Sequence, residues 1–260
     1  MEFGLKDKVA LVTGSSRGIG RGVALALAAE GCDVMLTGRD TAALEEVAAA
    51  IRKAGRRAGI AVIDLREKDA PAKLIETVKR EFGGLDILVN NAGATKRGDF
   101  LTLTDADWED GYALKFFGHM RLARAAWPLL KARHGSLISI GGTGARKPTA
   151  QFTIGSSVNA AVAAFTKCLA DRGKTDGVQV NCIHPSLVET DRTRRRIKAE
   201  VERTGKTPEQ IRDEIIREFN SIRVGTVEDV GDLVTFIVSS RATWLHGATI
   251  DLDGGEIPVL

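Results

Sequence analysis

The feature that most constrains this chain is a regular alternation of short apolar runs with longer amphipathic stretches. Runs that are apolar throughout are typical of strands buried on both faces of a parallel sheet, and the stretches between them have the period of helices. Such alternation predicts a doubly wound α/β fold. The expected strands cover residues 9–13, 34–37, 60–64, 87–90, 137–140, 178–183 and 249–252.

The stretches between these strands predict helices, and one segment departs from the alternation. Helices are expected at 19–30, 41–54, 69–82, 105–131, 156–171 and 228–239. Thr104 offers an N-cap to the long middle helix, and Thr207 with Gln210 forms a capping box. The segment 191–220 is expected to add one or two helices that lie as a lid over the carboxyl ends of the strands, where ligands bind in such folds.

A glycine-rich turn, Thr13-Gly14-Ser15-Ser16-Arg17-Gly18-Ile19-Gly20, lies between the first expected strand and the first helix. Gly14 permits a tight turn, Gly18 lets the backbone approach a pyrophosphate, and Gly20 lets the helix pack close to the sheet. This position favours a dinucleotide site over a turn without a ligand. We therefore expect a single Rossmann-type domain over residues 1–260, with a seven-stranded, mostly parallel sheet and the helical lid at 191–220.

Composition excludes several other classes of protein. The chain has 260 residues, 43% of them hydrophobic, which suffices for one large core. A net charge of +3 and few aromatic residues argue against nucleic acid. Cys32, Cys168 and Cys182 are too widely spaced for a zinc site or a disulfide framework. We therefore expect no metal, and we expect the protein to work in a reducing cytoplasm. The sequence shows no signal peptide and no membrane span.

Together with Asn90-Asn91-Ala92-Gly93, the glycine-rich turn resembles the short-chain dehydrogenase/reductase family. Further matches are Asp64, the segment 181–185 followed by Thr190, and Asp253-Gly254-Gly255, so the resemblance covers essentially the whole chain. It implies an oxidoreductase with a small-molecule substrate that assembles as a homotetramer or homodimer. The cofactor contacts that it implies are Gly14, Ser16, Arg17, Gly18, Ile19, Gly20, Arg39, Asp64, Leu65, Asn91, Ala92, Gly93, Lys115, Pro185, Val188 and Thr190.

Charge at the end of the second strand indicates which cofactor is bound. Family members that prefer NAD place a carboxylate there, to hold the ribose 2′-hydroxyl. This chain has Arg39 instead, and Arg17 in the glycine-rich turn can approach the same point. A guanidinium group suits a 2′-phosphate, which a carboxylate would repel. We therefore expect NADP(H) in preference to NAD(H).

The family's catalytic Asn, Ser, Tyr and Lys are all replaced in this chain. Their positions are occupied by Lys115, Gly142, Gly155 and Asn159, in a register fixed by the match at 165–167. Gly155 has no group that transfers a proton, and Asn159 carries no charge. The only tyrosine, Tyr112, lies far from the expected place. The loss of the Tyr and Ser side chains is expected to leave space for a larger substrate group.

Several interpretations of these replacements stay open. In one, the protein reduces or oxidises a small carbonyl or alcohol through a site centred on Lys115. Burial would lower the pKa of the Lys115 ammonium and so make it a proton donor. Tyr112, a weaker candidate, and His119 follow a spacing that places them with Lys115 on one helical face. In others, Lys115 only holds the nicotinamide ribose, the chain is a redox-inactive NADP-binding pseudoenzyme or sensor, or it is a Lys-dependent lyase or isomerase.

A basic cluster lies at the start of the lid and has two interpretations. It contains Arg192, Arg194, Arg195, Arg196 and Lys198. Such a cluster binds an anionic substrate or carrier, or it forms a solvated helix face. The solvated face is the expectation, because runs of charge are usually exposed.

Overall fold

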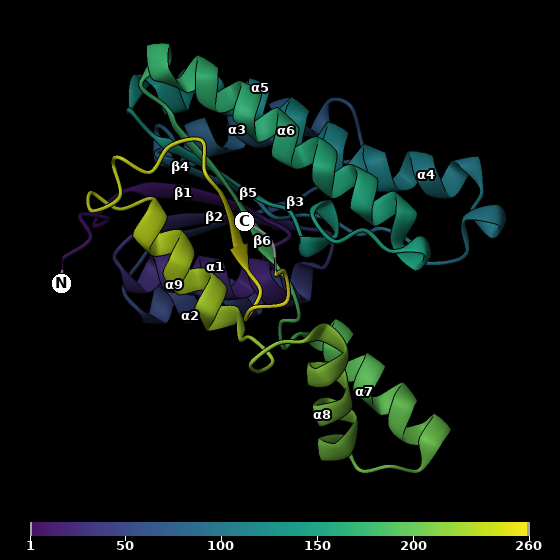
Figure 1. The fold of residues 1–260 in the computed structure, drawn as a ribbon. Coiled ribbons are helices and arrows are strands. Elements are labelled where there is room, and N and C mark those ends of the chain that lie inside the picture. The colour runs from purple at the N-terminus through teal and green to yellow at the C-terminus, as the bar shows by residue number, and fades with distance from the viewer. Residues whose placement is uncertain (1, 259–260) are drawn as a thin grey trace.

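The computed structural model describes residues 2–258, and its seven strands form one sheet in the order β3-β2-β1-β4-β5-β6-β7 (Figure 1). All neighbouring strands pair in parallel, so the predicted doubly wound, Rossmann-type fold is confirmed, and the sheet is parallel throughout rather than mostly. The strand order reverses between β1 and β4, and such reversals create ligand clefts. The strands are β1 (Val9–Thr13), β2 (Asp33–Gly38), β3 (Ala58–Val62), β4 (Ile87–Asn90), β5 (Ser136–Ile140), β6 (Gln179–Pro185) and β7 (Thr249–Leu252).

Helices cover both faces of this sheet. One layer holds α1 (Gly18–Ala29), α2 (Thr41–Lys53) and α9 (Val227–Ile237), and the other holds α3 (Ala70–Phe82), α5 (His119–Ala132) and α6 (Thr153–Asp176) (Figure 1). Strand β1 contributes to both cores, because alternate side chains point to opposite faces. Ala10 and Val12 pack with the first layer, whereas Val9 and Leu11 pack with the second.

The middle helix is interrupted, contrary to the expectation of one helix over 105–131. It begins as α4 (Asp105–Tyr112), where the predicted N-cap Thr104 forms a capping box with Asp107, and continues as a π-helical turn, Ala113–Gly118, before α5. A π turn adds a residue to the helical repeat and so rotates the side chains that follow it, and such turns are frequent at functional sites. Lys115 lies within this turn.

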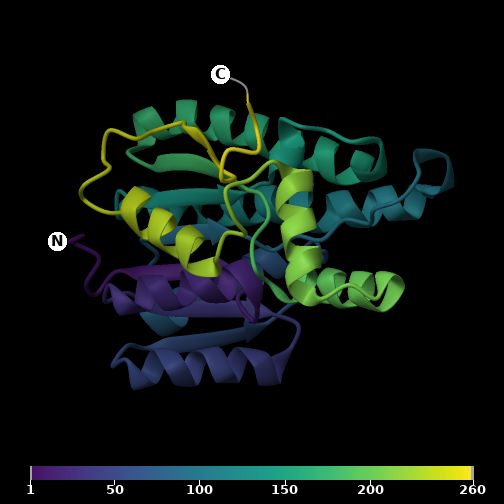
Figure 2. The ribbon, with the colours of Figure 1, turned by 60° about the horizontal axis from the view of Figure 1, so that its bottom comes forward.

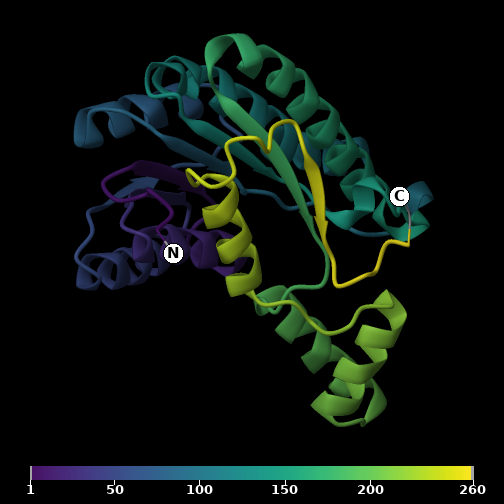
Figure 3. The same cartoon turned by 60° about the vertical axis from the view of Figure 1, so that its left-hand side comes forward.

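The segment 191–220 forms two helices, α7 (Asp191–Thr204) and α8 (Pro208–Phe219), as the sequence predicts. They have a small core of their own, built from Ile197, Ile211 and Ile215. Figures 1 and 3 show both helices projecting from the body of the sheet, and Figure 2 shows that they cross steeply. The predicted capping box of Thr207 and Gln210 begins α8.

Other boundaries differ by a few residues from the expected ones. α6 begins at Thr153 instead of 156 and continues to Asp176, where Gly177 ends it in the left-handed conformation. β3 covers 58–62 instead of 60–64. In the described residues, no helix combines the length and apolar character that crossing a bilayer requires.

Candidate active site

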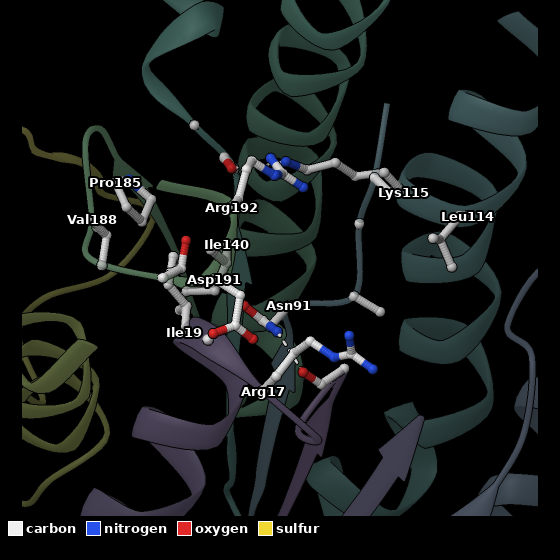
Figure 4. A pocket seen from close by; sticks show the side chains of 18 of the residues that line it. Arg17, Ile19, Asn91, Leu114, Lys115, Ile140, Pro185, Val188, Asp191 and Arg192 are labelled. Carbon is white, nitrogen blue, oxygen red and sulfur yellow. Dashed lines mark hydrogen bonds between the residues drawn. The ribbon is translucent and has the colours of Figure 1, made fainter. Parts of the chain in front are cut away.

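A cleft of about 1780 Å³ lies at the carboxyl ends of the strands, between the sheet and the first turns of α7. Its lining includes every cofactor residue that the sequence predicts except Gly20 (Figure 4). Gly142 and Asn159 line it as well, whereas Tyr112 and Gly155 do not. The predicted lining residues are Gly14, Ser16, Arg17, Gly18, Ile19, Arg39, Asp64, Leu65, Asn91, Ala92, Gly93, Lys115, Pro185, Val188 and Thr190.

The glycine-rich turn has a backbone that fits a phosphate group. Gly14 and Gly18 have φ angles of 65° and 55°, a region that side chains rarely adopt. A Cβ atom on Gly20 would collide with the carbonyl oxygen of Gly14, so this glycine serves close packing instead of ligand contact. No side chain caps the N-terminus of α1. The first N–H groups of that helix are therefore available to an anion.

Strand β4 is joined to this turn by a hydrogen-bond network. The hydroxyl oxygen of Thr13 accepts from the backbone N–H groups of Asn91 and Ala92 at 2.8 and 2.9 Å. The amide nitrogen of Asn91 donates to the carbonyl oxygen of Thr13 at 2.8 Å. These contacts fix the two sides of the cleft at the point where the strand order reverses.

Two ion pairs lie at the end of the cleft near β2. Arg39 lies 3.5 Å from Asp64, and Arg17 lies 2.9 Å from Asp40. Both arginine side chains are more than half exposed, so both pairs are weak and either guanidinium can turn toward a phosphate.

Lys115 extends into the cleft and donates from Nζ to the carbonyl oxygen of Gly141 at 2.8 Å. Its stem passes over Gly93, where a Cβ atom would lie 2.8 Å from the lysine Cδ. Burial of the ammonium, helped by the positive charge of Arg192, lowers the pKa of Lys115 from 10.5 to about 8, and Cys182 acts in the opposite direction. Protonated and neutral forms are both accessible near neutral pH as a result.

The structure does not bring Tyr112 and His119 into the cleft with Lys115. The π turn separates these positions, and Tyr112 packs edge-on against Phe116 at 6.2 Å between ring centres. His119 is buried, with Nε2 2.9 Å from the carbonyl oxygen of Ala92. Burial lowers the pKa of His119 to about 3, so its ring is neutral. Lys115 is close enough to His119 to contribute to this lowered pKa, but of the three side chains on the expected shared face only Lys115 lines the cleft.

The space of the missing tyrosine is filled. A Cβ atom on Gly155 would collide with the ring of Phe152, which lines the cleft. The Arg97 guanidinium lies 3.9 Å from the centre of the same ring. The expectation of free space at this position is therefore wrong. Phe152 is not predicted as a site residue from the sequence, because it precedes α6 and only the three-dimensional packing shows that it covers Gly155.

The positions of the missing serine and lysine contact each other. A Cβ atom on Gly142 would lie 2.9 Å from the amide nitrogen of Asn159. The backbone N–H of Gly142 donates to Nδ1 of His184 at 2.9 Å, and burial lowers the pKa of His184 to about 4. Oδ1 of Asn159 is buried and has no hydrogen-bond partner among the described residues.

The basic cluster of the lid divides between two environments. Arg192, Arg195 and Arg196 line the cleft, and Arg192 and Arg195 are at the same time exposed to solvent, in line with the expected solvated face. Arg194 instead pairs with Asp191 at 2.9 Å, and Lys198 lies 3.9 Å from Glu202. Across residues 2–258, no group of three or more His, Cys, Asp or Glu side chains is arranged to hold a metal ion.

This fold and glycine-rich turn match a known family. The family model described as short chain dehydrogenase matches residues 8–201. The chain is 32% identical to a 3-oxoacyl-[acyl-carrier-protein] reductase of Escherichia coli over 255 residues, which cover 96% of this chain and 97% of the relative. The chain therefore belongs to the short-chain dehydrogenase/reductase family of oxidoreductases, as the resemblance implies.

Solved structures agree with this assignment. An L-sorbose reductase of Gluconobacter frateurii, complexed with NADPH and L-sorbose, has a TM-score of 0.96 and 31% identity, and each chain is covered fully. A 3-oxoacyl (acyl-carrier-protein) reductase of Agrobacterium tumefaciens with NADP bound has a TM-score of 0.87 and 31% identity, with 97% of this chain and 95% of that chain covered.

Proposed function

We propose that this protein is an NADP(H)-dependent oxidoreductase that acts on a small carbonyl compound or alcohol, with Lys115 as the group that exchanges the proton. One observation carries this proposal: an ammonium with a pKa of about 8 extends into the cleft that Gly142 and Asn159, two of the replaced catalytic positions, also line. Proton donors are most effective when their pKa is near the working pH.

The preference for NADP(H) is supported by Arg39 and Arg17, which line the cleft at the end of β2. Both solved relatives described above bind the same cofactor. Gly14, Gly18 and the N-terminus of α1 would hold its pyrophosphate, and Thr190 and Val188 its nicotinamide. When bound, this cofactor supplies or accepts the hydride.

The remaining chemistry falls to the chain itself. In reduction, Lys115 Nζ donates a proton to the carbonyl oxygen, which becomes the hydroxyl of the alcohol, and the neutral amine then takes a proton from water. The Gly141 carbonyl oxygen holds Nζ at the end of β5 and limits its rotation. In oxidation, the neutral amine accepts the hydroxyl proton. A group with a pKa of about 8 serves either direction.

A second function is favoured by Phe152. Its ring occupies the place of the family's tyrosine, so the cleft is closed at the point where substrates of the family react. A protein that binds NADP(H) without turnover, as a sensor or scaffold, would tolerate this closure. Lys115 would then hold the nicotinamide ribose.

Transfer of an isotope label separates these functions. The protein is incubated with NADPH deuterated at both C4 positions and a metabolite extract, and products are searched for deuterium by mass spectrometry. We expect label with the wild type and none with Lys115→Met. The matched control is Lys96→Met, which removes an exposed lysine paired with Asp107 outside the cleft. Label with all three proteins would remove Lys115 from the mechanism.

Absence of label has a different meaning. If all three proteins bind NADPH saturably and none transfers deuterium, the sensor function is favoured. Unlabelled products that depend on Lys115 would instead indicate a lysine-dependent lyase or isomerase.

We further infer that residues 1–260 act as one domain, that 191–220 is a lid, and that the protein is a homotetramer or homodimer. The separate core of α7 and α8 supports the lid, because it lets the two helices move as a unit. Light scattering of the purified protein tests the assembly, and a monomeric mass would overturn it.

A further inference from the structure

Three arginines in the cleft have no assigned role. Arg97, Arg192 and Arg195 all line it, and none has a carboxylate within 4.0 Å among residues 2–258. The other arginines of α7 differ in this respect. Arg194, Arg196 and Arg203 each pair with a glutamate or an aspartate.

The acidic side chains that line the cleft are already paired. Asp40 and Asp64 pair with Arg17 and Arg39 at the nucleotide end. The other three acidic residues are paired as well: Asp191 with Arg194, Glu218 with Arg196 and Glu256 with Lys147. The lining contains nine basic residues against five acidic ones. The unpaired arginines therefore give the cleft an excess of positive charge.

This excess concentrates positive charge at one place in the cleft, where Arg97, Arg192 and Arg195 are all accessible to solvent and to a ligand. Burial and repulsion from Arg192 and Arg196 lower the pKa of Arg97. Arg192 lies in the first turn of α7, where the helix dipole already places partial positive charge, and no side chain caps this N-terminus. Arginines gathered near a helix N-terminus that has no side-chain cap form a site that an anion would stabilise.

Two contacts place the site at the reaction end of the cleft. Arg97 stacks on Phe152, which covers Gly155. Arg192 lies close enough to Lys115 to lower its pKa, and Figure 4 shows the two side chains pointing toward each other. An anion bound here would therefore lie next to the proton-donating group, and away from the ion pairs near β2.

We propose that Arg97, Arg192 and Arg195 bind an oxyanionic group of the substrate, a carboxylate or a phosphate, a few bonds away from the carbonyl that Lys115 serves. This inference rests on the proposed oxidoreductase function. Guanidinium groups match both oxyanions through paired hydrogen bonds. The bound anion would also offset the charge of Arg192 and so favour the protonated, proton-donating form of Lys115. An uncharged analogue of the substrate would neither bind to the arginines nor favour the protonated form of Lys115.

The test measures binding and turnover in parallel. Wild type, the double variant Arg97→Gln/Arg192→Gln and the control Arg194→Gln are saturated with NADP⁺, which occupies the 2′-phosphate site. Binding of inorganic phosphate and of acetoacetate is then measured by calorimetry. Reduction by NADPH is compared between acetoacetate and its methyl ester, and between dihydroxyacetone phosphate and dihydroxyacetone. The control removes one arginine of α7 that does not itself line the cleft and that already has a carboxylate partner, Asp191.

We expect the wild type and Arg194→Gln to bind one of the two anions, and the double variant to bind it roughly tenfold more weakly or worse, since charge-assisted hydrogen bonds are strong. The better anion identifies the group as carboxylate or phosphate. Equal binding by all three proteins would overturn the proposal. So would a loss confined to NADPH affinity, which would assign Arg192 to the cofactor.

The two proposals fail in different ways. If the double variant loses anion binding while no protein reduces any carbonyl, the anion site stands and the oxidoreductase function falls. If all three proteins reduce charged and neutral carbonyls equally well, the oxidoreductase function stands and the anion site falls.

Discussion

The two ends of the cleft are built from different parts of the chain. At the nucleotide end, the contacts come mainly from backbone: the turn at Gly14 and Gly18, the N-terminus of α1, and the main chain of Asn91 held by Thr13. At the reaction end they come from side chains, among them Lys115, Phe152 and Asn159. A backbone site tolerates substitution around it, whereas a side-chain site changes with every replacement. On the register predicted from the sequence, this difference accounts for a nucleotide end that follows the family pattern and a reaction end that departs from it.

Lys115 offers the sharpest test of this division. We expect Lys115→Met to lower the rate of reduction by about 100- to 10,000-fold, the range typical of a lost general acid, while the affinity for NADPH changes only a few-fold. In the wild type, the rate of reduction should fall as pH rises through about 8, because the ammonium then loses its proton. Steady-state rates and fluorescence titrations measure both quantities.

If Lys115→Met lowered the affinity for NADPH as much as the rate of reduction, Lys115 would be a contact of the nicotinamide ribose. The separation between the nucleotide end and the reaction end of the cleft would then not hold. A pH profile with no change near 8 would remove the lysine from proton transfer.

Arg39 tests the nucleotide end. We expect Arg39→Asp to weaken NADPH binding by about 10- to 100-fold and to favour NADH relatively, since a carboxylate repels the 2′-phosphate. Titration of both cofactors by fluorescence measures the preference. The control is Arg80→Asp, a charge reversal at an exposed residue of α3 outside the cleft. Unchanged preference in the Arg39 variant would disprove the choice of cofactor.

The stability of the protein provides a test that needs no substrate. Folding lowers the pKa of Lys115 from 10.5 to about 8, so the folded protein bears a cost for the charged form below pH 8, and this cost disappears as pH rises to about 10.5. We therefore expect Lys115→Met to stabilise the fold at pH 7 by about 1–3 kcal/mol, with the lost hydrogen bond to Gly141 opposing part of the gain. The difference should shrink toward pH 10.5.

Denaturant unfolding at pH 7, 8.5 and 10 measures this difference. A variant that is less stable than the wild type at pH 7 would mean that the ammonium is well solvated in the folded protein, and the depressed pKa would be refuted.

What the sequence predicts well follows the same division. The strands and the glycine-rich turn are local patterns, and the structure has the seven predicted strands in one sheet and positive φ angles at Gly14 and Gly18 of the turn. The failures arise where the outcome depends on contacts between distant residues. The π turn at 113–118 interrupts the middle helix, Tyr112 does not line the cleft that Lys115 enters, and no spacing rule for regular helices predicts the turn. Phe152 fills the place of an absent side chain, and α7 turns only some of its arginines into the cleft. Charge count alone does not distinguish those arginines.

Restoring the family's residues gives the smallest expected effect and tests whether the reaction end can revert. Gly155→Tyr with Asn159→Lys should give no reduction of a simple ketone, and Gly142→Ser is also required, because these groups act as a unit. The structure adds a fourth condition. A tyrosine at 155 meets the Phe152 ring, so Phe152→Ala is needed to admit it. NADPH oxidation should therefore be undetectable in the double and triple variants and measurable only in the quadruple one. Activity of the double variant alone would show that the Phe152 ring moves freely, and the reaction end would then differ from the family only in its side chains, not in its shape.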